Sequence, residues 1–250
     1  MKKILKRILF TLLSIVLVVV LIAVGYVAYI LLSYSRIGSM ELDITRNSDK
    51  SFVEVDQTYS ISTYNIGFGA YSPDFTFFLD TGYDIDGNET VGYYGKAKNK
   101  DEVYNNTIGS ISAVKDLELD FLLLQEVDID STRSYNINQN EMFAEYFNEY
   151  DNVFACNFKS AFLPYPLYDM HGKSYAGLST FSKYQINNAF RQEYTISESF
   201  SKLFDLDRCF SIQSIEVSNG KTLHIVNSHM SAYDKGGTIR EQQVAELNDF

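Results

Sequence analysis

The chain has 250 residues, of which 46% are hydrophobic and 15% aromatic, a composition that supports a packed core and excludes a disordered or collagen-like chain. It has 21 Lys and Arg residues against 32 Asp and Glu residues, so its formal net charge is -11. This acidic balance excludes a basic protein that coats nucleic acid, and any affinity for phosphate must come from a local site or a metal ion.

A long apolar segment follows a basic N-terminus. Residues 8–32 carry no charge and are dominated by Leu, Val and Ile, which at about 1.5 Å per residue is enough to cross a bilayer as one transmembrane helix. Residues 1–7 contain four basic side chains and are predicted to stay in the cytoplasm, which places the rest of the chain outside the cell. A cleaved signal peptide is the alternative, although its apolar core is usually shorter.

The exported part is predicted to be a stalk followed by one domain. Residues 33–56 mix polar and charged side chains, which predicts a juxtamembrane stalk that leads into a domain at residues 57–250. Residues 59–66 alternate and are β-branched, so they predict a strand that enters a glycine-containing loop. Residues 71–100 are rich in Asp, Gly, Asn and Tyr and predict a long loop or insertion.

The rest of the domain predicts an α/β fold. Apolar residues recur at helical spacing between residues 108 and 117, and the run FLLLQEV is typical of a buried strand. Asn219-Gly220 is a favoured tight turn and predicts a hairpin. The further predicted elements are strands at residues 121–127, 151–158, 177–181, 209–217 and 223–227 and a helix at residues 238–250.

Three polar residues stand at the ends of predicted strands. The carboxylate of Glu126 directly follows an apolar run, where a bound cation would compensate for its desolvation; a Glu that simply reaches water is an equal alternative. Asn65 has a similar position but is, taken alone, more often a turn residue. His229 follows LHIVNS and could contact a phosphate oxygen or protonate a leaving group, although a lone histidine is commonly structural.

The other histidines and the two cysteines give weaker signals. His171 lies in a loop that contains Pro and Gly and is a candidate substrate-loop residue, whereas His224 lies within the hairpin and is expected to be structural. Cys156 and Cys209 could form a disulfide outside the cell or remain buried thiols, and the sequence leaves their state open. Neither cysteine has the spacing of a zinc site.

The order of the motifs STYNIGFG, DFLLLQEVD, GLSTFSKY and LHIVNSHM resembles that of the endonuclease/exonuclease/phosphatase superfamily, which includes DNase I, neutral sphingomyelinases and inositol polyphosphate 5-phosphatases. The resemblance covers about Tyr59 to Phe250 and implies a DNase I-like four-layered α/β sandwich. It also implies metal-dependent hydrolysis of a phosphate monoester or diester, with Mg²⁺ or Mn²⁺ as the cofactor. The substrate would be a lipid head group, a nucleic acid or a small phosphate ester, and no protein partner is inferred.

The resemblance assigns roles to the strand-end residues. Glu126 would be a metal ligand, Asn65 a second polar group at the metal site, and His229 a contact to the scissile phosphate. A hard divalent cation prefers oxygen ligands and neutralises phosphate charge, which agrees with these roles.

Two arginines are weaker candidates for binding the substrate. By the same resemblance, the loop that follows Glu126 supports the site through Asp128, Asp130, Ser131 and Arg133. A surface charge is the commoner outcome for Arg133. Arg208 could bind phosphate in a bidentate manner, but an ion pair with Asp205 or Asp207 is favoured.

Two motifs of the family have no counterpart in these 250 residues, a GDFN-like motif and a C-terminal Asp-His pair. We therefore expect the chain to be the N-terminal part of a longer protein or a truncated product, and to be catalytically incompetent as it stands. The predicted function is that of the intact protein. The alternative is a non-catalytic, membrane-anchored binding or scaffold protein of the same fold.

Overall fold

The computed structural model describes residues 2–33, 35–196, 207–231 and 236–250, and the chain divides into two units, Met1–Ser35 and Arg36–Phe250. The first unit is helix α1 (Lys2–Ser33), which contains the predicted transmembrane segment. By length and composition alone, this helix could cross a membrane. The second unit holds all the other described elements.

The second unit is built from strands and a few short helices. Its strands are β1 (Met40–Glu41), β2 (Ile44–Thr45), β3 (Ile61–Asn65), β4 (Thr81–Tyr83), β5 (Glu89–Val91), β6 (Phe121–Asp128), β7 (Asp151–Leu163), β8 (Gly172–Ser182), β9 (Asn188–Glu193), β10 (Cys209–Glu216) and β11 (Thr222–His229). Its helices are α2 (Lys100–Val114), α3 (Gln139–Tyr146) and α4 (Thr238–Asp249), with the 3-10 turns η1 (Gly67–Gly69), η2 (Lys115–Leu117) and η3 (Thr132–Ser134).

Two sheets form the centre of this unit. One has the strand order β1-β9-β10-β11 and the other the order β2-β7-β8-β6-β3, while β4 and β5 form a separate hairpin. Strands β3 and β6 run parallel and the other pairs are antiparallel. Because β3 and β6 run in the same direction, Asn65 and Glu126 lie at the same end of the five-stranded sheet, where both strands approach their C-terminal ends.

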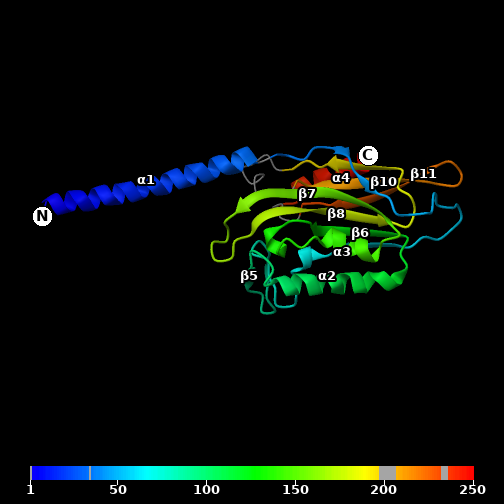
Figure 1. Cartoon of the computed structure of the whole chain (residues 1–250), viewed down its shortest axis with the longest axis horizontal. Coiled ribbons are helices and arrows are strands. Elements are labelled where there is room, and N and C mark those ends of the chain that lie inside the picture. The colour runs from blue at the N-terminus through cyan, green and yellow to red at the C-terminus, as the bar shows by residue number, and fades with distance from the viewer. Residues whose placement is uncertain (1, 34, 197–206, 232–235) are drawn as a thin grey trace. The chain divides into compact units, whose positions relative to one another are not determined.

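The sheets pack face to face, and helices cover their outer faces (Figure 1). Phe121 and Leu123 of one sheet pack with Ile215 and Ile225 of the other. Leu122 and Leu124, whose side chains alternate to the opposite face of β6, pack with residues of α2 and α3. Helix α4 lies over the four-stranded sheet, where Leu247 contacts the cluster around Phe210. The result is four layers, helix, sheet, sheet and helix, which confirms the predicted α/β sandwich.

The observed elements follow most of the predicted ones. The strands predicted at residues 121–127, 209–217 and 223–227 correspond to β6, β10 and β11, and Gly220 takes a φ of +79° in the predicted hairpin turn. Residues 71–100 are mainly irregular, as predicted.

The compact unit begins earlier than the sequence predicts. Within the predicted stalk at residues 33–56, β1 pairs with β9 and β2 pairs with β7, and Val53 is buried between the sheets. Two-residue strands leave no periodic pattern, so only the pairing partners supplied by the folded sheets reveal them.

Both cysteines are free thiols, and Cys209 is buried whereas Cys156 is partly exposed. Burial raises the pKa of Cys156 to about 12 and that of Cys209 to about 11. Thiols with such raised pKa values stay protonated at neutral pH, so both residues serve as packing groups in this structure.

Candidate active site

Glu126 leaves the sheet at a β-bulge. The pairing of β6 with β8 shifts register between Leu124 and Val127, so β6 carries one extra residue there. Glu126 lies inside this shift with a φ of +55°, a conformation that is unfavourable for a residue with a side chain. Its neighbours along β6 are buried, whereas the Glu126 side chain is 26% exposed. The bulge therefore turns one carboxylate out of a buried strand.

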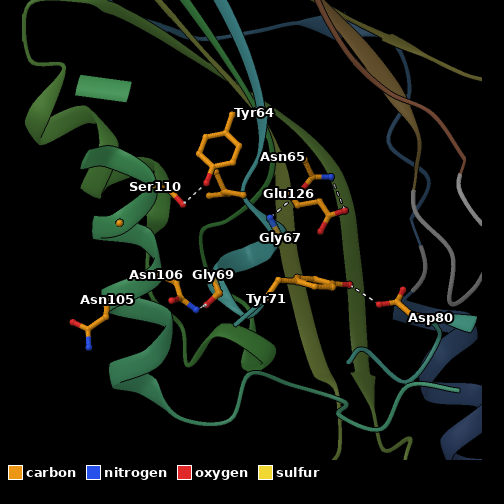
Figure 2. A pocket seen from close by; sticks show the side chains of 12 residues that line it. Tyr64, Asn65, Gly67, Gly69, Tyr71, Asp80, Asn105, Asn106, Ser110 and Glu126 are labelled. Carbon is orange, nitrogen blue, oxygen red and sulfur yellow. Dashed lines mark hydrogen bonds between the residues drawn. The ribbon is translucent and has the colours of Figure 1, made fainter. Parts of the chain in front are cut away.

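Asn65 holds this carboxylate from the neighbouring strand. Its amide nitrogen Nδ2 donates a hydrogen bond of 3.0 Å to Oε1 of Glu126, and its oxygen Oδ1 accepts one of 2.9 Å from the backbone N–H of Gly67 (Figure 2). Asn65 thus caps the turn after β3 and also orients Glu126. The turn role expected for Asn65 is therefore observed, and its role at a metal site stays a prediction.

His229, at the end of β11 in the four-stranded sheet, lies next to Glu126. Its Nε2 lies 3.6 Å from Oε1 of Glu126, and its side chain is 18% exposed. Burial lowers the pKa of His229 to about 3, and the positive charges of Arg208 and Arg133 act in the same direction. The imidazole is therefore neutral at pH 7, and its contact with Glu126 is not an ion pair. Within the described residues, its Nδ1 is buried without a hydrogen-bond partner.

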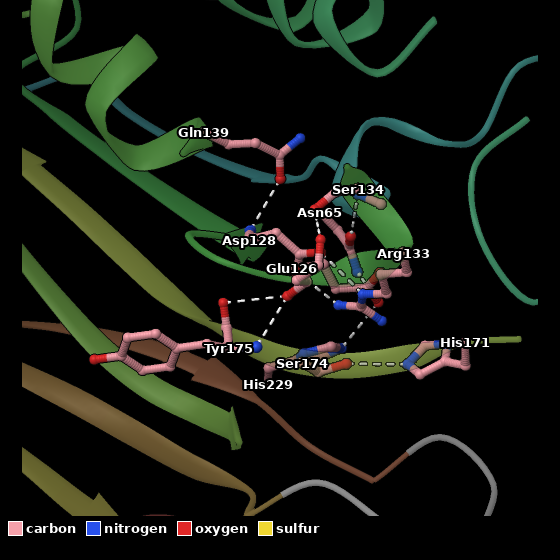
Figure 3. Close-up of polar contacts among 12 residues, drawn as sticks. Asn65, Glu126, Asp128, Arg133, Ser134, Gln139, His171, Ser174, Tyr175 and His229 are labelled. Atoms are coloured by element: carbon pink, nitrogen blue, oxygen red, sulfur yellow. Dashed lines mark hydrogen bonds and ion pairs between the residues drawn. The ribbon is translucent and has the colours of Figure 1, made fainter. Parts of the chain in front are cut away.

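Arg133 is a buried support of the site and not a surface charge. Its guanidinium donates hydrogen bonds of 3.0 Å and 2.8 Å to the two carboxylate oxygens of Asp128, which is fully buried (Figure 3). The guanidinium also lies 4.1 Å from the ring centroid of Phe68, and Gln139 Oε1 accepts from the backbone N–H of Asp128. The alternative of an exposed Arg133 was wrong because the aromatic loop after β3 covers it.

His171 is buried and does not face the site. Its exposure is 3%, its Nδ1 lies 2.8 Å from the carbonyl oxygen of Gly95, and its Nε2 lies 3.1 Å from Oγ of Ser174. A neutral ring satisfies both contacts if Nδ1 donates and Nε2 accepts. Burial lowers the pKa of His171 to about 4, with Arg133 acting in the same direction. The expectation of a substrate-loop residue is corrected, since a side chain enclosed in this way cannot contact a bound substrate.

Arg208 lies beside His229 at the start of the hairpin. Cys209 pairs with His229 in the register of β10 and β11, and the side chain of Arg208 is buried. Its charge contributes to the lowered pKa of His229. Asp205, one of the carboxylates expected to pair with Arg208, falls outside the described residues, so that ion pair and phosphate binding both stay predictions.

A polar cavity of about 590 Å³ adjoins Glu126 and Asn65 (Figure 2). Gly67 allows the ring of Tyr71 to form one wall of the cavity, because a Cβ at position 67 would lie 2.5 Å from that ring. The φ of Gly67, +53°, also suits glycine. The Tyr71 hydroxyl donates a hydrogen bond of 2.9 Å to Asp80. The cavity is lined by Tyr64, Asn65, Ile66, Gly67, Gly69, Tyr71, Asp80, Asn105, Asn106, Gly109, Ser110 and Glu126.

Apart from Asn65 and Glu126, sequence reasoning missed the residues that line this cavity. Most of them come from the turn and loop after β3 and from one face of α2, so only the fold brings them together. The adjacent asparagines Asn105 and Asn106, just before the helical pattern that begins at residue 108, were the one signal that could have drawn attention to this face.

Glu126 is the residue suited to hold a divalent cation. Its carboxylate is partly exposed, lies beside a polar cavity and is oriented by an amide donor. The described residues contain no cluster of three or more His, Cys, Asp and Glu side chains of the kind that holds a metal by protein ligands alone. Mg²⁺ commonly binds through one or two carboxylates, so a single carboxylate fits this ion better than it fits Zn²⁺. Asn65 presents its nitrogen toward Glu126, and its role as a direct ligand stays a prediction.

No family model and no curated protein matches the chain. Among solved structures, it is similar to an endonuclease/exonuclease/phosphatase from Beutenbergia cavernae, with 13% identity and a TM-score of 0.49 over 76% of this chain and 43% of that one. It is also similar to ANGEL2, described as a 2',3'-cyclic phosphatase, with 16% identity and a TM-score of 0.47 over 83% and 49% of the two chains.

A third similar structure is sphingomyelinase C from Streptomyces griseocarneus, with 14% identity and a TM-score of 0.42 over 78% of this chain and 58% of that one. These three similarities concern the fold alone. The chain spans about half the length of the first two structures.

Proposed function

We propose that the protein is a metal-dependent phosphoesterase that hydrolyses a phosphate monoester or diester. The observation that carries the proposal is the convergence of Glu126, Asn65 and His229, from two sheets, beside a polar cavity. A carboxylate for a cation and a nitrogen donor for phosphate are the two groups that such a reaction needs at one place.

Glu126 would hold Mg²⁺ or Mn²⁺ through its carboxylate. When bound, such an ion neutralises phosphate charge and stabilises oxygens that gain charge during displacement. Asn65 keeps the carboxylate in one orientation, because its amide is itself fixed by the backbone N–H of Gly67. The buried pair of Asp128 and Arg133 supports the loop that follows.

His229 would contact the phosphate as a neutral imidazole. With its pKa lowered to about 3, it carries one N–H and no charge at pH 7. In this state it donates a hydrogen bond to a phosphate oxygen, and it is a poor proton donor to a leaving group. The lowered pKa of His229 therefore favours binding of phosphate over acid catalysis.

The cavity would hold the alcohol part of the substrate. Its hydroxyl, amide and carboxylate groups can form hydrogen bonds with a polar alcohol next to the ester bond. The substrate would be a lipid head group, a nucleic acid or a small phosphate ester, three classes that a direct assay separates.

The apolar helix would place this activity outside the cell. Its uncharged stretch is long enough to span a bilayer, and the basic residues before it favour a cytoplasmic N-terminus. A cleaved signal sequence would change the anchoring but would leave the domain on the same side of the membrane.

Hydrolysis of bis-p-nitrophenyl phosphate tests the proposal, measured on membranes from cells that produce the intact protein, with Mg²⁺ or Mn²⁺ and with EDTA. We expect metal-dependent hydrolysis that EDTA abolishes and that Glu126→Gln lowers at least about a hundredfold. The control is Glu145→Gln, since Glu145 is an exposed carboxylate on α3 and should leave the rate unchanged. Assays with DNA, sphingomyelin and inositol phosphates then separate the substrate classes.

Equal rates for Glu126→Gln and the unchanged protein would refute the metal role of Glu126. Calorimetric titration with Mn²⁺ adds a readout that does not require turnover. Mn²⁺ binding through Glu126 without any hydrolysis would support the alternative of a non-catalytic binding protein.

A further inference from the structure

The contact between Glu126 and His229 crosses from one sheet to the other. Glu126 belongs to β6 of the five-stranded sheet and His229 to β11 of the four-stranded sheet. The backbone hydrogen bonds of either sheet fix strands only within that sheet, so they do not set the 3.6 Å distance between Nε2 and Oε1. Something between the sheets must hold the two strands in register.

Asn227 supplies that link, two residues before His229 on the same strand. It is fully buried, and its Nδ2 donates to the carbonyl oxygens of Leu124 and Ser179, both at 3.1 Å, and to Oγ1 of Thr180 at 3.2 Å. These acceptors belong to β6 and β8, so the Asn227 amide joins the two sheets. A buried amide or carbonyl without such a partner would be costly.

The link continues to the strand that carries Asn65. Gln125, which precedes Glu126, donates from Nε2 to Oδ1 of Asn227 at 2.7 Å and to Oγ1 of Thr63 at 3.1 Å. Thr63 lies two residues before Asn65 on β3. Each of the three strands that carry a site residue therefore contributes one side chain to a single network, which is buried at Gln125 and Asn227 and reaches the surface at Thr63.

The network is attached to the bulge itself. Leu124 and Ser179 form the last regular pair before β6 and β8 shift register, and Asn227 contacts the carbonyl oxygens of both. Residues two apart on a strand point to the same face, so Asn227 and His229 both face the opposite sheet. The position of the bulge that turns out Glu126 is thereby tied to the strand that carries His229.

We propose that Asn227 and Gln125 are positioning residues that set the distance between Glu126 and His229 across the two sheets. Neither side chain touches the place where substrate would bind. They act through the bulge and through β11, and the inference rests on the proposed function only for its catalytic consequence.

The test is an NMR measurement on the full chain in detergent micelles, with His and Glu isotopically labelled. In the unchanged protein we expect a nuclear Overhauser effect between the His229 ring and the Glu126 side chain. Asn227→Ala should abolish it. Ile225→Ala is the matched control, because Ile225 lies on the same face of β11 and packs between the sheets without taking part in the network. It should lower stability while the nuclear Overhauser effect remains.

A catalytic readout on membranes complements this measurement. Asn227→Ala should lower kcat for bis-p-nitrophenyl phosphate about ten- to a hundredfold with KM little changed, and should have no further effect in a His229→Ala background. If Asn227→Ala does not fold, Gln125→Met removes the link to Asn227 and Thr63 while keeping side-chain volume, and it should weaken the same signal.

Retention of the signal in Asn227→Ala or Gln125→Met, or its equal loss in Ile225→Ala, would overturn the inference. If the unchanged protein shows no hydrolysis, the proposed function fails, but the NMR comparison still decides whether these two side chains position the site.

Discussion

Two carboxylates at opposite ends of the five-stranded sheet have opposite surroundings. Asp151, at the start of β7, is fully buried and accepts hydrogen bonds from three backbone N–H groups, those of Asn47, Ser48 and Ile186, at 2.8–2.9 Å. Glu126 is partly exposed, and its Oε1 faces the amide of a side chain and a neutral imidazole.

The difference separates a carboxylate whose charge the fold compensates from one whose charge it leaves partly uncompensated. Backbone N–H groups that converge on Asp151 are fixed by the fold and compensate its negative charge. Glu126 has weaker compensation, lies on an unfavourable backbone conformation and opens toward a cavity, so it keeps the capacity to bind a cation.

The largest effect on stability is expected from Asp151→Ala. The change leaves three buried N–H donors without an acceptor, and we expect the free energy of unfolding to fall by about 3 to 5 kcal/mol. Urea unfolding of the full chain in micelles measures this. The same truncation at Asp130, an exposed ion pair, should change little, and a similar loss at both positions would contradict the comparison.

Acidification should destabilise the fold through His171. Its pKa is about 4 when folded and 6.5 ordinarily, so the unfolded chain binds a proton below pH 6.5 while the folded chain does not. The free energy of unfolding should therefore fall as the pH drops from 6.5 to 4, by about 1.4 kcal/mol per pH unit from this residue, or roughly 3 kcal/mol in all. The lowered pKa of His229 acts with the same sign.

Unfolding midpoints measured across this pH range test the assignment. His171→Asn should lose the part of the slope that belongs to His171, since an amide can still donate to the carbonyl oxygen of Gly95 but does not titrate. An unchanged slope in His171→Asn would show that other groups cause the acid sensitivity.

The smallest effect on stability is expected at the β-bulge, and it is an increase. Glu126→Gly should raise the free energy of unfolding by about 1 kcal/mol, because glycine adopts a φ of +55° without the cost that a side chain incurs. The same variant should lose Mn²⁺ binding in calorimetry. A protein destabilised by Glu126→Gly would mean that the carboxylate is a structural group like Asp151.

Much of this arrangement could be predicted from sequence. The apolar run of β6 and the Asn219-Gly220 turn depend on local chemistry, so they specify a buried strand and a hairpin without tertiary information. Glu126, Asn65 and His229 were predicted as candidates because polar residues at the ends of apolar strands are unusual. The structure brings these three together.

Other features depend on contacts that no local pattern encodes. The bulge at Glu126 comes from a one-residue shift against β8, and the burial of His171 comes from the loop that covers it. Gln125 and Asn227 interrupt apolar strands in the sequence, yet their link across the sheets requires both strands to be placed first. Strand β9 also escaped prediction, because it is short and mixes polar with apolar residues.

The placement of β1 and β2 bears on where a protease could cut the chain without disturbing the two sheets. Within six residues the chain adds a strand to the outer edge of each sheet, alongside β9 and β7. A cut before Arg36 would keep both short strands paired at these edges. A cut after Thr45 would remove them and expose further backbone groups of β9 and β7, so the remaining fragment would be more prone to aggregate.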